Sequence, residues 1–385
     1  MSTQRYAVIA GGEINGLGVA RSLARAGIPM VILDEDLTRP TMRTRHGTKR
    51  RVASLEGETF LQELATLRGQ FSADPILFLT QEKSVVTVSE NLAAVARNYC
   101  ISMPPAGTMR LLMNKTGFQT LAENLGCPVP RAVTLAREDD LGAARELFYP
   151  CIMKPTVKTA AYDQRFKKAY RITDYAAAES LFMEIKDYSA MIVQEWIEGS
   201  DQAIYFCLQY WGREQQPLAS FVGRKLRSWP PRVGGTASCV AAPEDAPEVE
   251  KLTNNFFTKT GFLGMGSMEY KKDARTGRFV MIEPTVGRTD FQEEVATLNG
   301  VNIPAVAHRY ESGESLDRVP RPVRPTAWVV SQLERWAREM QPEDGANIPQ
   351  DVRHYDAIRR MDDPAPWLFM LAERLEDRLA TWRKR

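Results

Sequence analysis

Short apolar runs and amphipathic segments alternate along the first hundred residues of the chain. The run YAVIAGG, from Tyr6, has the pattern of a buried strand leading into a glycine-rich turn, and residues 18–28 follow with apolar positions at helical spacing. A second apolar run, MVILDED, comes next, and FSADPILFLT and NLAAVARNYC continue the same order to about residue 100. This succession of strand, turn, helix and strand predicts a doubly wound α/β unit as the first domain.

Strand-like segments dominate the middle of the chain. The helix-like segment KTGFQTLAENLG precedes them, with Phe118, Leu121 and Leu125 on one face and a stop at Gly126. The strand candidates then follow closely, with helices at 174–186 and 248–260 between some of them: YPCIMKP, KAYRI, MIVQEWI, QAIYFCLQY, LASFVGRKL, GMGSMEYKK and RFVMIEPT. This order is typical of antiparallel sheets that carry helices.

The end of the chain has a different pattern. The proline-dotted segment at 316–325 has the composition of a linker, and the tail beyond it reads mostly as amphipathic helix with a packing role, for example WLFMLAERLEDRLATW. The whole pattern predicts a mixed α/β (α+β) protein in four parts, at residues 1–103, 104–198, 199–315 and 316–385.

Composition and charge exclude several classes of protein. The 50 Lys and Arg residues stand against 48 Asp and Glu, so the net charge of +2 gives no reason to expect nucleic acid or a membrane as partner. Apolar runs such as residues 366–372 are far shorter than the ~20 residues that cross a bilayer. The N-terminus lacks a secretory signal pattern, so we expect a cytoplasmic protein. The 5 cysteines form no CxxC pair and the 3 histidines are widely separated, which argues against a disulfide framework or zinc site.

The first turn, from Ala10 to Gly18, lies where a dinucleotide-binding loop would lie. Its glycines at 11, 12, 16 and 18 do not follow the GxGxxG spacing, although Asp34 ends the second strand where a ribose-binding carboxylate would stand. A tight turn that opens a helix is the simpler interpretation. A nucleotide-dependent oxidoreductase that uses this domain stays open as an alternative.

Lysines and carboxylates in the middle of the chain indicate a different nucleotide site. Lys115 and Lys154 are compact charges suited to phosphate oxygens, and Lys154 ends an apolar strand. After the strand MIVQEWI, the backbone of residues 195–197 can read an adenine edge and a later carboxylate can hold ribose hydroxyls. Glu269 and Glu283 lie in two late strands, a pairing that suits Mg²⁺ on nucleotide phosphates. Each residue alone is more often a solvated rim residue, but all four features together in this order favour a nucleotide site.

With these motifs the sequence resembles the ATP-grasp superfamily over roughly residues 5 to 312. Among its members it looks most like the carboxylate–amine ligases related to D-aspartate ligase and to the ATP domain of carbamoyl-phosphate synthase. The resemblance implies a Rossmann-like domain before a two-part ATP-grasp fold and a helical C-terminal extension. It also implies ATP and Mg²⁺ as cofactors, a small carboxylate and an amine as substrates, an acyl-phosphate route that releases ADP and phosphate, and a homodimer.

The resemblance also implies a role for each candidate position. For the nucleotide, the phosphate-binding lysines, adenine hinge and ribose acid are Lys115, Lys154, Gln194, Glu195, Ile197 and Asp201. For catalysis, the residues are Arg224, Lys225 and Arg288. For the metal they are Glu269, Glu283 and Thr285, and for the substrate Glu13 and Asn15.

Two segments depart from the pattern of the superfamily. No glycine occurs between Lys154 and Gly199, so we expect side chains to clamp the phosphates in place of backbone N–H groups; the candidates are Lys158, Arg165, Lys167, Lys168 and Arg171. Thr285 stands where relatives place an asparagine, so water or Asp290 is expected to complete the oxygen shell of a second Mg²⁺. These departures keep open a third function, a catalytically weak ATP-binding regulatory protein.

Two further segments carry less information. The basic run from Arg43 to Arg51 has the composition of a solvated loop. The segment 229–235, WPPRVGG, follows shortly after Arg224. Its prolines and glycines are typical of an ordinary turn, and its place beside Arg224 equally suits a mobile substrate loop.

Overall fold

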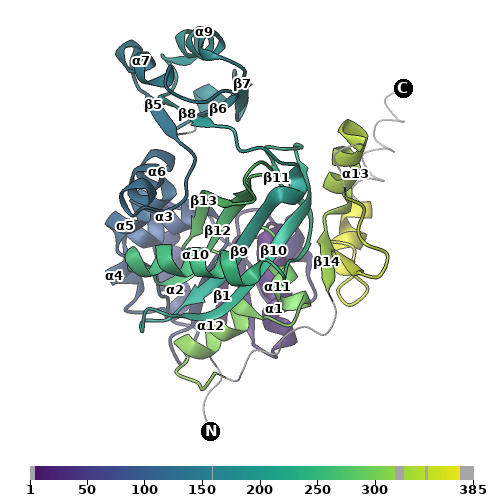
Figure 1. Cartoon of the computed structure of the whole chain (residues 1–385). Coiled ribbons are helices and arrows are strands. Elements are labelled where there is room, and N and C mark those ends of the chain that lie inside the picture. Colours follow the sequence, from purple (N-terminus) through teal and green to yellow (C-terminus); the bar gives the residue numbers. More distant parts are fainter. Residues whose placement is uncertain (1–4, 158, 317–324, 343–345, 373–385) are drawn as a thin grey trace, which may run out of the picture.

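The computed structural model of the chain describes residues 5–157, 159–316, 325–342 and 346–372. Its strands form three sheets, of four, four and seven strands (Figure 1). The mixed α/β architecture is therefore as predicted. Of the predicted C-terminal segments, residues 317–324 of the linker and the tail from residue 373 lie outside the described residues.

The first domain is built on a parallel sheet in the order β3-β2-β1-β4. Its strands are β1 (Ala7–Ala10), β2 (Met30–Asp34), β3 (Thr48–Arg51) and β4 (Ile76–Leu79). Helices connect and cover them: α1 (Ile14–Arg25), η1 (Pro40–Arg43), α2 (Gly57–Arg68), α3 (Glu82–Glu90) and α4 (Leu92–Val95). Every residue of β1, β2 and β4 is buried, because helices pack on both faces of a parallel sheet. The basic run instead supplies η1 residues and the edge strand β3, which its charges suit.

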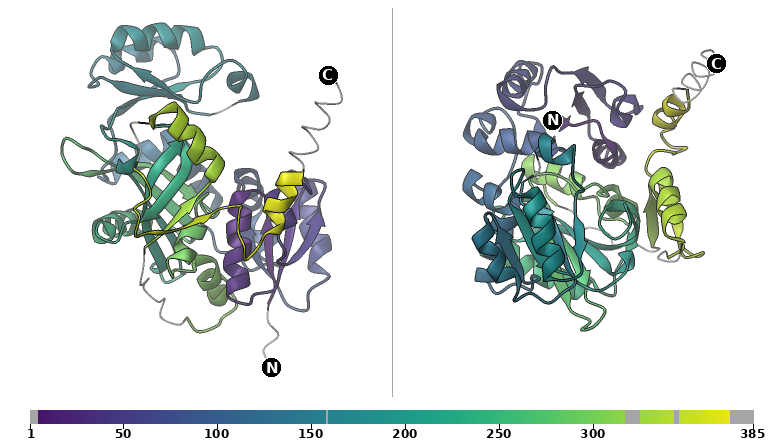
Figure 2. Two further views of the ribbon diagram at one scale, coloured as in Figure 1. Left: turned by 90° about the vertical axis from the view of Figure 1, so that its right-hand side faces the viewer. Right: turned by 90° about the horizontal axis from the view of Figure 1, so that it is seen from above.

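The second sheet belongs to a lid that stands apart above the rest of the molecule (Figure 2). It is antiparallel, in the order β5-β8-β6-β7, with strands β5 (Ala132–Leu135), β6 (Cys151–Pro155), β7 (Tyr170–Ile172) and β8 (Met191–Glu195). Its helices are η2 (Glu138–Asp140), α7 (Leu141–Ala144), α8 (Ala160–Asp163) and α9 (Tyr175–Ile185). The lid has a hydrophobic core of its own, centred on Phe182, Met153 and Met191. Before it, α5 (Ala106–Met113) and α6 (Lys115–Asn124) pack on the main body.

The third and largest sheet runs β13-β12-β9-β10-β11-β14-β15. Its strands are β9 (Ile204–Trp211), β10 (Pro217–Trp229), β11 (Gly235–Ala241), β12 (Gly264–Lys272), β13 (Phe279–Val286), β14 (Thr326–Val329) and β15 (Arg353–Asp356). The helices associated with it are η3 (Asp201–Ala203), α10 (Ala246–Lys259), α11 (Glu294–Leu298), α12 (Ile303–Glu311) and α13 (Ser331–Met340). Neighbouring residues of β9 pack on opposite faces, Cys207 with α10 in one core and Phe206 with α12 in the other. The second core is shared with α1, which joins the first domain to the large sheet.

The C-terminal extension contributes sheet as well as the predicted helix. Strand β14 pairs with β11, and β15 pairs in parallel with β14. Residues 365–372 form a further helix beside the first domain, where buried Arg21 of α1 binds the Asp363 carboxylate at 3.0 Å and the Ala357 carbonyl at 2.6 Å. The extension is thus fixed to both the first domain and the large sheet. No helix among the described residues is long and apolar enough to cross a membrane.

Candidate functional site

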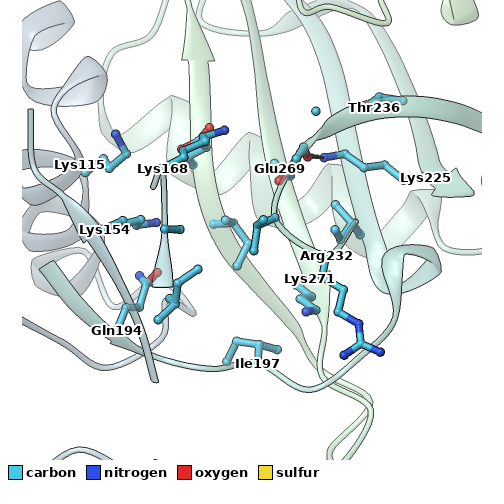
Figure 3. Close-up of a pocket in the computed structure, with 18 of the residues that line it drawn as sticks. Lys115, Lys154, Lys168, Gln194, Ile197, Lys225, Arg232, Thr236, Glu269 and Lys271 are labelled. Carbon is cyan, nitrogen blue, oxygen red and sulfur yellow. Dashed lines mark hydrogen bonds and ion pairs between the residues drawn. The ribbon is translucent and has the colours of Figure 1, made fainter. Parts of the chain in front are cut away.

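A cavity of about 250 Å³ lies between the lid and the large sheet. Strands β6 and β8 line it from the lid, and β10, β12 and β13 line it from the large sheet. It brings together ten of the predicted site residues: Lys115, Lys154, Gln194, Glu195, Ile197, Lys225, Glu269, Glu283, Thr285 and Arg288. We call it the catalytic cavity. Figure 3 shows Lys115, Lys154 and Lys168 gathered on one side of it and Lys225 with Glu269 on the other.

Two carboxylates face each other on the floor of the catalytic cavity. Glu269 of β12 pairs in register with Glu283 of β13, so both side chains leave the same face of the sheet. The Lys225 ammonium lies 2.7 Å from a Glu269 carboxylate oxygen and is almost fully buried. Burial by itself would lower the pKa of Lys225, but the attraction of Glu269 outweighs it and raises the pKa. This lysine therefore stays charged and compensates one of the two carboxylates.

The lysines of the other side set the charge of Glu283. Burial favours a raised pKa for Glu283, yet the fields of Lys154, Lys168 and Lys115 hold its pKa below the ordinary value. Lys154 projects into the cavity because its neighbour on β6, Met153, is buried in the core of the lid on the opposite face. Burial, opposed by Glu283, lowers the pKa of Lys154, and the nearby lysines lower it further. The like charges of these lysines repel one another, so the cluster is suited to binding a polyanion.

The segment that leaves β8 forms one edge of the catalytic cavity. The Gln194 amide donates to Gln119 Oε1 at 2.9 Å, and the Glu195 carboxylate accepts the Phe148 N–H at 3.0 Å. These bonds fix the predicted adenine hinge against the lid and α6. Gln194 and Ile197 both lie at this edge in Figure 3.

A crevice at the carboxyl ends of the parallel strands adjoins the catalytic cavity and shares Arg288, Asp290 and Phe291 with it. We call it the N-terminal crevice. Asn15 lines it and is buried, donating to the carbonyls of Thr289 at 2.8 Å and Thr80 at 3.1 Å. Its Oδ1 accepts the Thr289 hydroxyl at 2.5 Å. Asn15 thus fixes the loop that carries Arg288.

The other predicted substrate residue, Glu13, has a more accessible position. Its carboxylate lies 2.6 Å from the Arg39 guanidinium, and both side chains are a little under half exposed. Asp290, also on the wall of the crevice, accepts the Ser267 hydroxyl at 2.9 Å. Glu13 and Asp290 therefore present carboxylates to the crevice from the first domain and from the large sheet.

Two further predicted residues, Arg224 and Asp201, line neither the catalytic cavity nor the N-terminal crevice. Arg224 precedes Lys225 on β10 and leaves the opposite face, where it pairs in register with Tyr205. Asp201 is buried, and its carboxylate accepts the N–H groups of Ser228 at 2.7 Å and Arg232 at 2.9 Å. Asp201 thereby holds the base of the loop 229–235, whose residues 232–235 do line the cavity.

Among the predicted phosphate clamp residues that the structure describes, Lys168 is the one that lines the catalytic cavity. Arg165 instead bonds the Tyr188 hydroxyl, and Arg171 lies 5.4 Å from the Trp196 ring. Lys158 lies outside the described residues. Of the clamp candidates that the structure describes, a single side chain therefore reaches toward Glu283.

The structure adds Lys271 and Trp196 to the residues that sequence reasoning singled out. Both line the catalytic cavity, and the Lys271 ammonium lies 4.5 Å from the centre of the Trp196 ring. Lys271 follows Glu269 by two positions on β12, so the alternation of a strand places both on one face. That spacing was a usable signal in the sequence, whereas Trp196 was indicated only through its backbone, as part of the predicted hinge 195–197.

The turn from Ala10 to Gly18 is held by hydrogen bonds and packing within the first domain. The Asp34 carboxylate is buried and accepts the N–H groups of Gly12 at 2.5 Å and Asp36 at 2.9 Å. A Cβ on Gly16 would lie 2.0 Å from the Gly11 carbonyl oxygen, so α1 packs directly on the turn. The tight-turn interpretation is confirmed, and both Asp34 oxygens are already bonded to backbone.

A metal at this site would need ligands beyond the protein. Among the described residues, no three His, Cys, Asp or Glu side chains are grouped so that they could hold an ion. The Glu269 and Glu283 pair, with the Thr285 hydroxyl beside it, therefore fits a cation that keeps water or ligand oxygens, as Mg²⁺ does.

Comparison with known proteins gives distant relatives, and no family model matches the chain. The formate-dependent phosphoribosylglycinamide formyltransferase of Psychromonas ingrahamii is 23% identical over 281 residues, which cover 70% of this chain and 65% of that protein. The enzyme of the same name from Solidesulfovibrio magneticus is 26% identical over 181 residues, 46% of this chain and 42% of that protein. The chain thus matches less than two thirds of the length of either relative.

Solved structures resemble the chain over more of its length. The N5-carboxyaminoimidazole synthetase of Staphylococcus aureus, complexed with ADP, has a TM-score of 0.67 and 16% identity and covers 92% of both chains. The biotin carboxylase domain of the Hydrogenobacter thermophilus 2-oxoglutarate carboxylase, with MgADP and bicarbonate, has a TM-score of 0.64 and 14% identity over 84% of this chain and 73% of that one. At such identities the likeness concerns the fold, and the predicted ATP-grasp fold is confirmed.

Proposed function

With the ATP-grasp fold as premise, we propose that the chain is an ATP-dependent carboxylate–amine ligase. It forms an amide through an acyl phosphate and releases ADP and phosphate. The observation that carries this proposal is the catalytic cavity, where Lys115 of α6 and Lys154 and Lys168 of the lid face the Glu269–Glu283 pair beside the hinge. A nucleotide triphosphate matches this charge pattern, since its phosphates are polyanionic and a divalent cation links them to carboxylates.

The nucleotide would lie with its adenine at the hinge and its phosphates among the lysines. Lys115 is the first residue of α6, an end of a helix where a cation is disfavoured unless an anion lies close by. The N–H groups of that turn and the ammonium together favour phosphate oxygens. The ADP in the Staphylococcus aureus neighbour supports a nucleotide in this fold.

Mg²⁺ fits the donor set of β12 and β13. Glu269, Glu283 and the Thr285 hydroxyl would hold it, and when bound it offsets charge on the phosphates. Burial raises the pKa of Glu269, and Lys225 opposes that rise and orients the carboxylate through the 2.7 Å contact. Two like charges opposite one another on neighbouring strands otherwise destabilise a sheet.

The reaction would take place where the catalytic cavity meets the N-terminal crevice. A substrate carboxylate oxygen attacks the γ-phosphorus, the bond to ADP breaks, and an acyl phosphate forms. The amine then attacks the acyl carbon, phosphate leaves with the amine proton, and an amide remains. Arg288 belongs to both spaces, so its guanidinium can stabilise the oxyanion of the second step. Asp201 and Arg224 take positioning roles outside the cavity in this proposal.

A phosphate-release screen of acid and amine pairs with ATP and Mg²⁺, with products identified by mass, tests the proposal. We expect ADP and phosphate only when a carboxylate and an amine are both present. Glu283→Gln should abolish turnover, and Glu146→Gln, an exposed lid change, should leave it intact. AMP and pyrophosphate as products would refute the acyl-phosphate route.

The other functions that the sequence left open give different results in the same assay. Nucleotide binding without turnover for any pair would favour the regulatory ATP-binding protein. NAD(P)H binding would favour the oxidoreductase, against which the bonded Asp34 carboxylate already argues. A small-molecule ligase needs neither nucleic acid nor membrane, and homodimerisation and cytoplasmic localisation remain predictions.

A further inference from the structure

Three hollows follow one another across the chain. The catalytic cavity shares Arg288 and Asp290 with the N-terminal crevice, and the crevice shares Glu13 with a third space. This third space, of about 380 Å³, lies between the first domain and the C-terminal extension. We call it the tryptophan pocket. The shared residues place the N-terminal crevice between the catalytic cavity and the tryptophan pocket.

The described lining of the N-terminal crevice is acidic. Six carboxylates line it: Glu13, Asp34, Glu35, Asp36, Glu82 and Asp290. The cations of the same lining are Arg39, Lys83 and Arg288, of which Lys83 binds Glu35 at 2.6 Å and Arg39 binds Glu13 at 2.6 Å. Arg288 faces the catalytic cavity as well. An ammonium is attracted into such a space, and a phosphate is repelled.

The tryptophan pocket is apolar where the crevice is charged. Apolar side chains from α1, from α13 and the residue before it, from the segment after β15 and from the helix 365–372 meet in it: Ile14, Val330, Leu333, Trp336, Ile358 and Trp367. Trp336 also packs against Trp229 at the base of the loop 229–235, with ring centres 5.5 Å apart. The C-terminal extension thus supplies both the pocket and a contact to a wall of the catalytic cavity.

The cations closest to the tryptophan pocket are already engaged. The Arg359 guanidinium lies over the Trp367 ring at 5.0 Å. Arg360 is buried and paired with Glu294 at 2.8 Å and Asp362 at 2.7 Å. The described lining of the tryptophan pocket is therefore mainly aromatic and aliphatic, and Arg359, its one lining cation, is stacked on an aromatic ring.

We propose that the acceptor is an amine with an apolar tail, its ammonium in the N-terminal crevice and its tail in the tryptophan pocket. This inference rests on the proposed ligase function and narrows its substrate class. It separates the chain from the relatives named for phosphoribosylglycinamide, whose acceptor carries a phosphate. The order of the adjoining hollows and the change from an acidic to an apolar lining carry it.

Binding of linear primary amines from ethylamine to hexylamine, measured by calorimetry on the full chain saturated with ADP and Mg²⁺, tests the proposal without turnover. Each methylene buried should tighten binding about fourfold. O-phosphoethanolamine should bind more weakly than ethylamine. Trp367→Ala should flatten the dependence on chain length, and Leu368→Ala, the exposed neighbour on the same helix, should keep it.

The outcomes separate this inference from the ligase proposal. Affinity that does not change with chain length, equal loss in both variants, or preference for the phosphorylated amine would overturn the inference. If chain-length dependence is present and Trp367→Ala removes it, while no acid and amine pair yields ADP, the pocket stands and the ligase proposal falls. If amide forms from every amine at equal KM, the ligase proposal stands and the pocket assignment falls.

Discussion

Glu293→Gln should stabilise the fold at neutral pH, by an amount that grows with pH. Glu293 precedes α11 and is buried, and its Oε1 has no hydrogen-bond partner. Burial, together with the nearby Asp290 carboxylate, raises the pKa of Glu293 to about 8. The folded protein therefore keeps this group protonated at neutral pH, when the unfolded chain would ionise it.

The sign of the pH dependence follows from that difference. Between the ordinary pKa of 4.5 and about 8 the folded state holds a proton that the unfolded state has lost, so the free energy of unfolding falls as pH rises. The slope is about 1.4 kcal/mol per pH unit, which amounts to roughly 3 kcal/mol at pH 7. Glutamine has the same shape and no charge, so the variant escapes this loss.

Thermal unfolding of both proteins from pH 5 to pH 8 measures the effect. The melting temperatures should nearly coincide at pH 5 and differ by roughly 3 °C at pH 7, with the variant higher. Glu294→Gln is the matched control, because this neighbouring buried carboxylate binds Arg360 at 2.8 Å and its loss should destabilise. A difference that is constant with pH, or that shrinks as pH rises, would contradict the reasoning.

Three further substitutions test the site. Lys154→Met should weaken ATP binding by roughly tenfold or more, because a charge-assisted contact is lost. The melting temperature should change little, because the side chain faces the cavity. Normal ATP kinetics with a lower melting temperature would favour a structural role. Thr285→Asn should lower the Mg²⁺ concentration that gives half-maximal rate, and an unchanged Mg²⁺ titration would remove Thr285 from the metal site. Asn15→Ala should lower kcat by roughly tenfold with an unchanged KM for ATP, since the loop of Arg288 loses buried hydrogen bonds; a change confined to KM for ATP would contradict that role.

The sequence predicted those elements in which the buried positions are apolar. Strands β1 and β4 are apolar at every position, β2 is apolar up to its last residue, Asp34, and α6 shows its apolar face and its stop. The basic strand β3 carries no such pattern, because neither face of this edge strand is fully covered. Residues Arg353–Asp356, RHYD, form strand β15 because they pair with β14, and no local sequence pattern indicates that contact.

The candidate site was predictable where the alternation of side chains along a strand determines which face of the sheet a residue occupies. Lys154 and Glu269 lie on the cavity face of their strands, as alternation requires. The same rule separates Arg224 from Lys225, so adjacent basic residues on a strand could not both reach one cavity. Asp201 is a different case, since its two hydrogen bonds go to residues more than 25 positions away, and the sequence offered no sign of them.

The C-terminal extension connects the proposed chemistry to its acceptor. Its strand β14 joins the large sheet, its helix α13 places Trp336 against Trp229, and Asp363 anchors it to Arg21 of the first domain. Because these three contacts hold the C-terminal extension in place, the tryptophan pocket keeps a fixed distance from Arg288. An acceptor tail bound there would therefore fix where its amine lies, and orientation of this kind accelerates a reaction even without any added charge. In the proposed reaction the lid, with Lys154 and Lys168, would bind the nucleotide, and the extension would bind the acceptor.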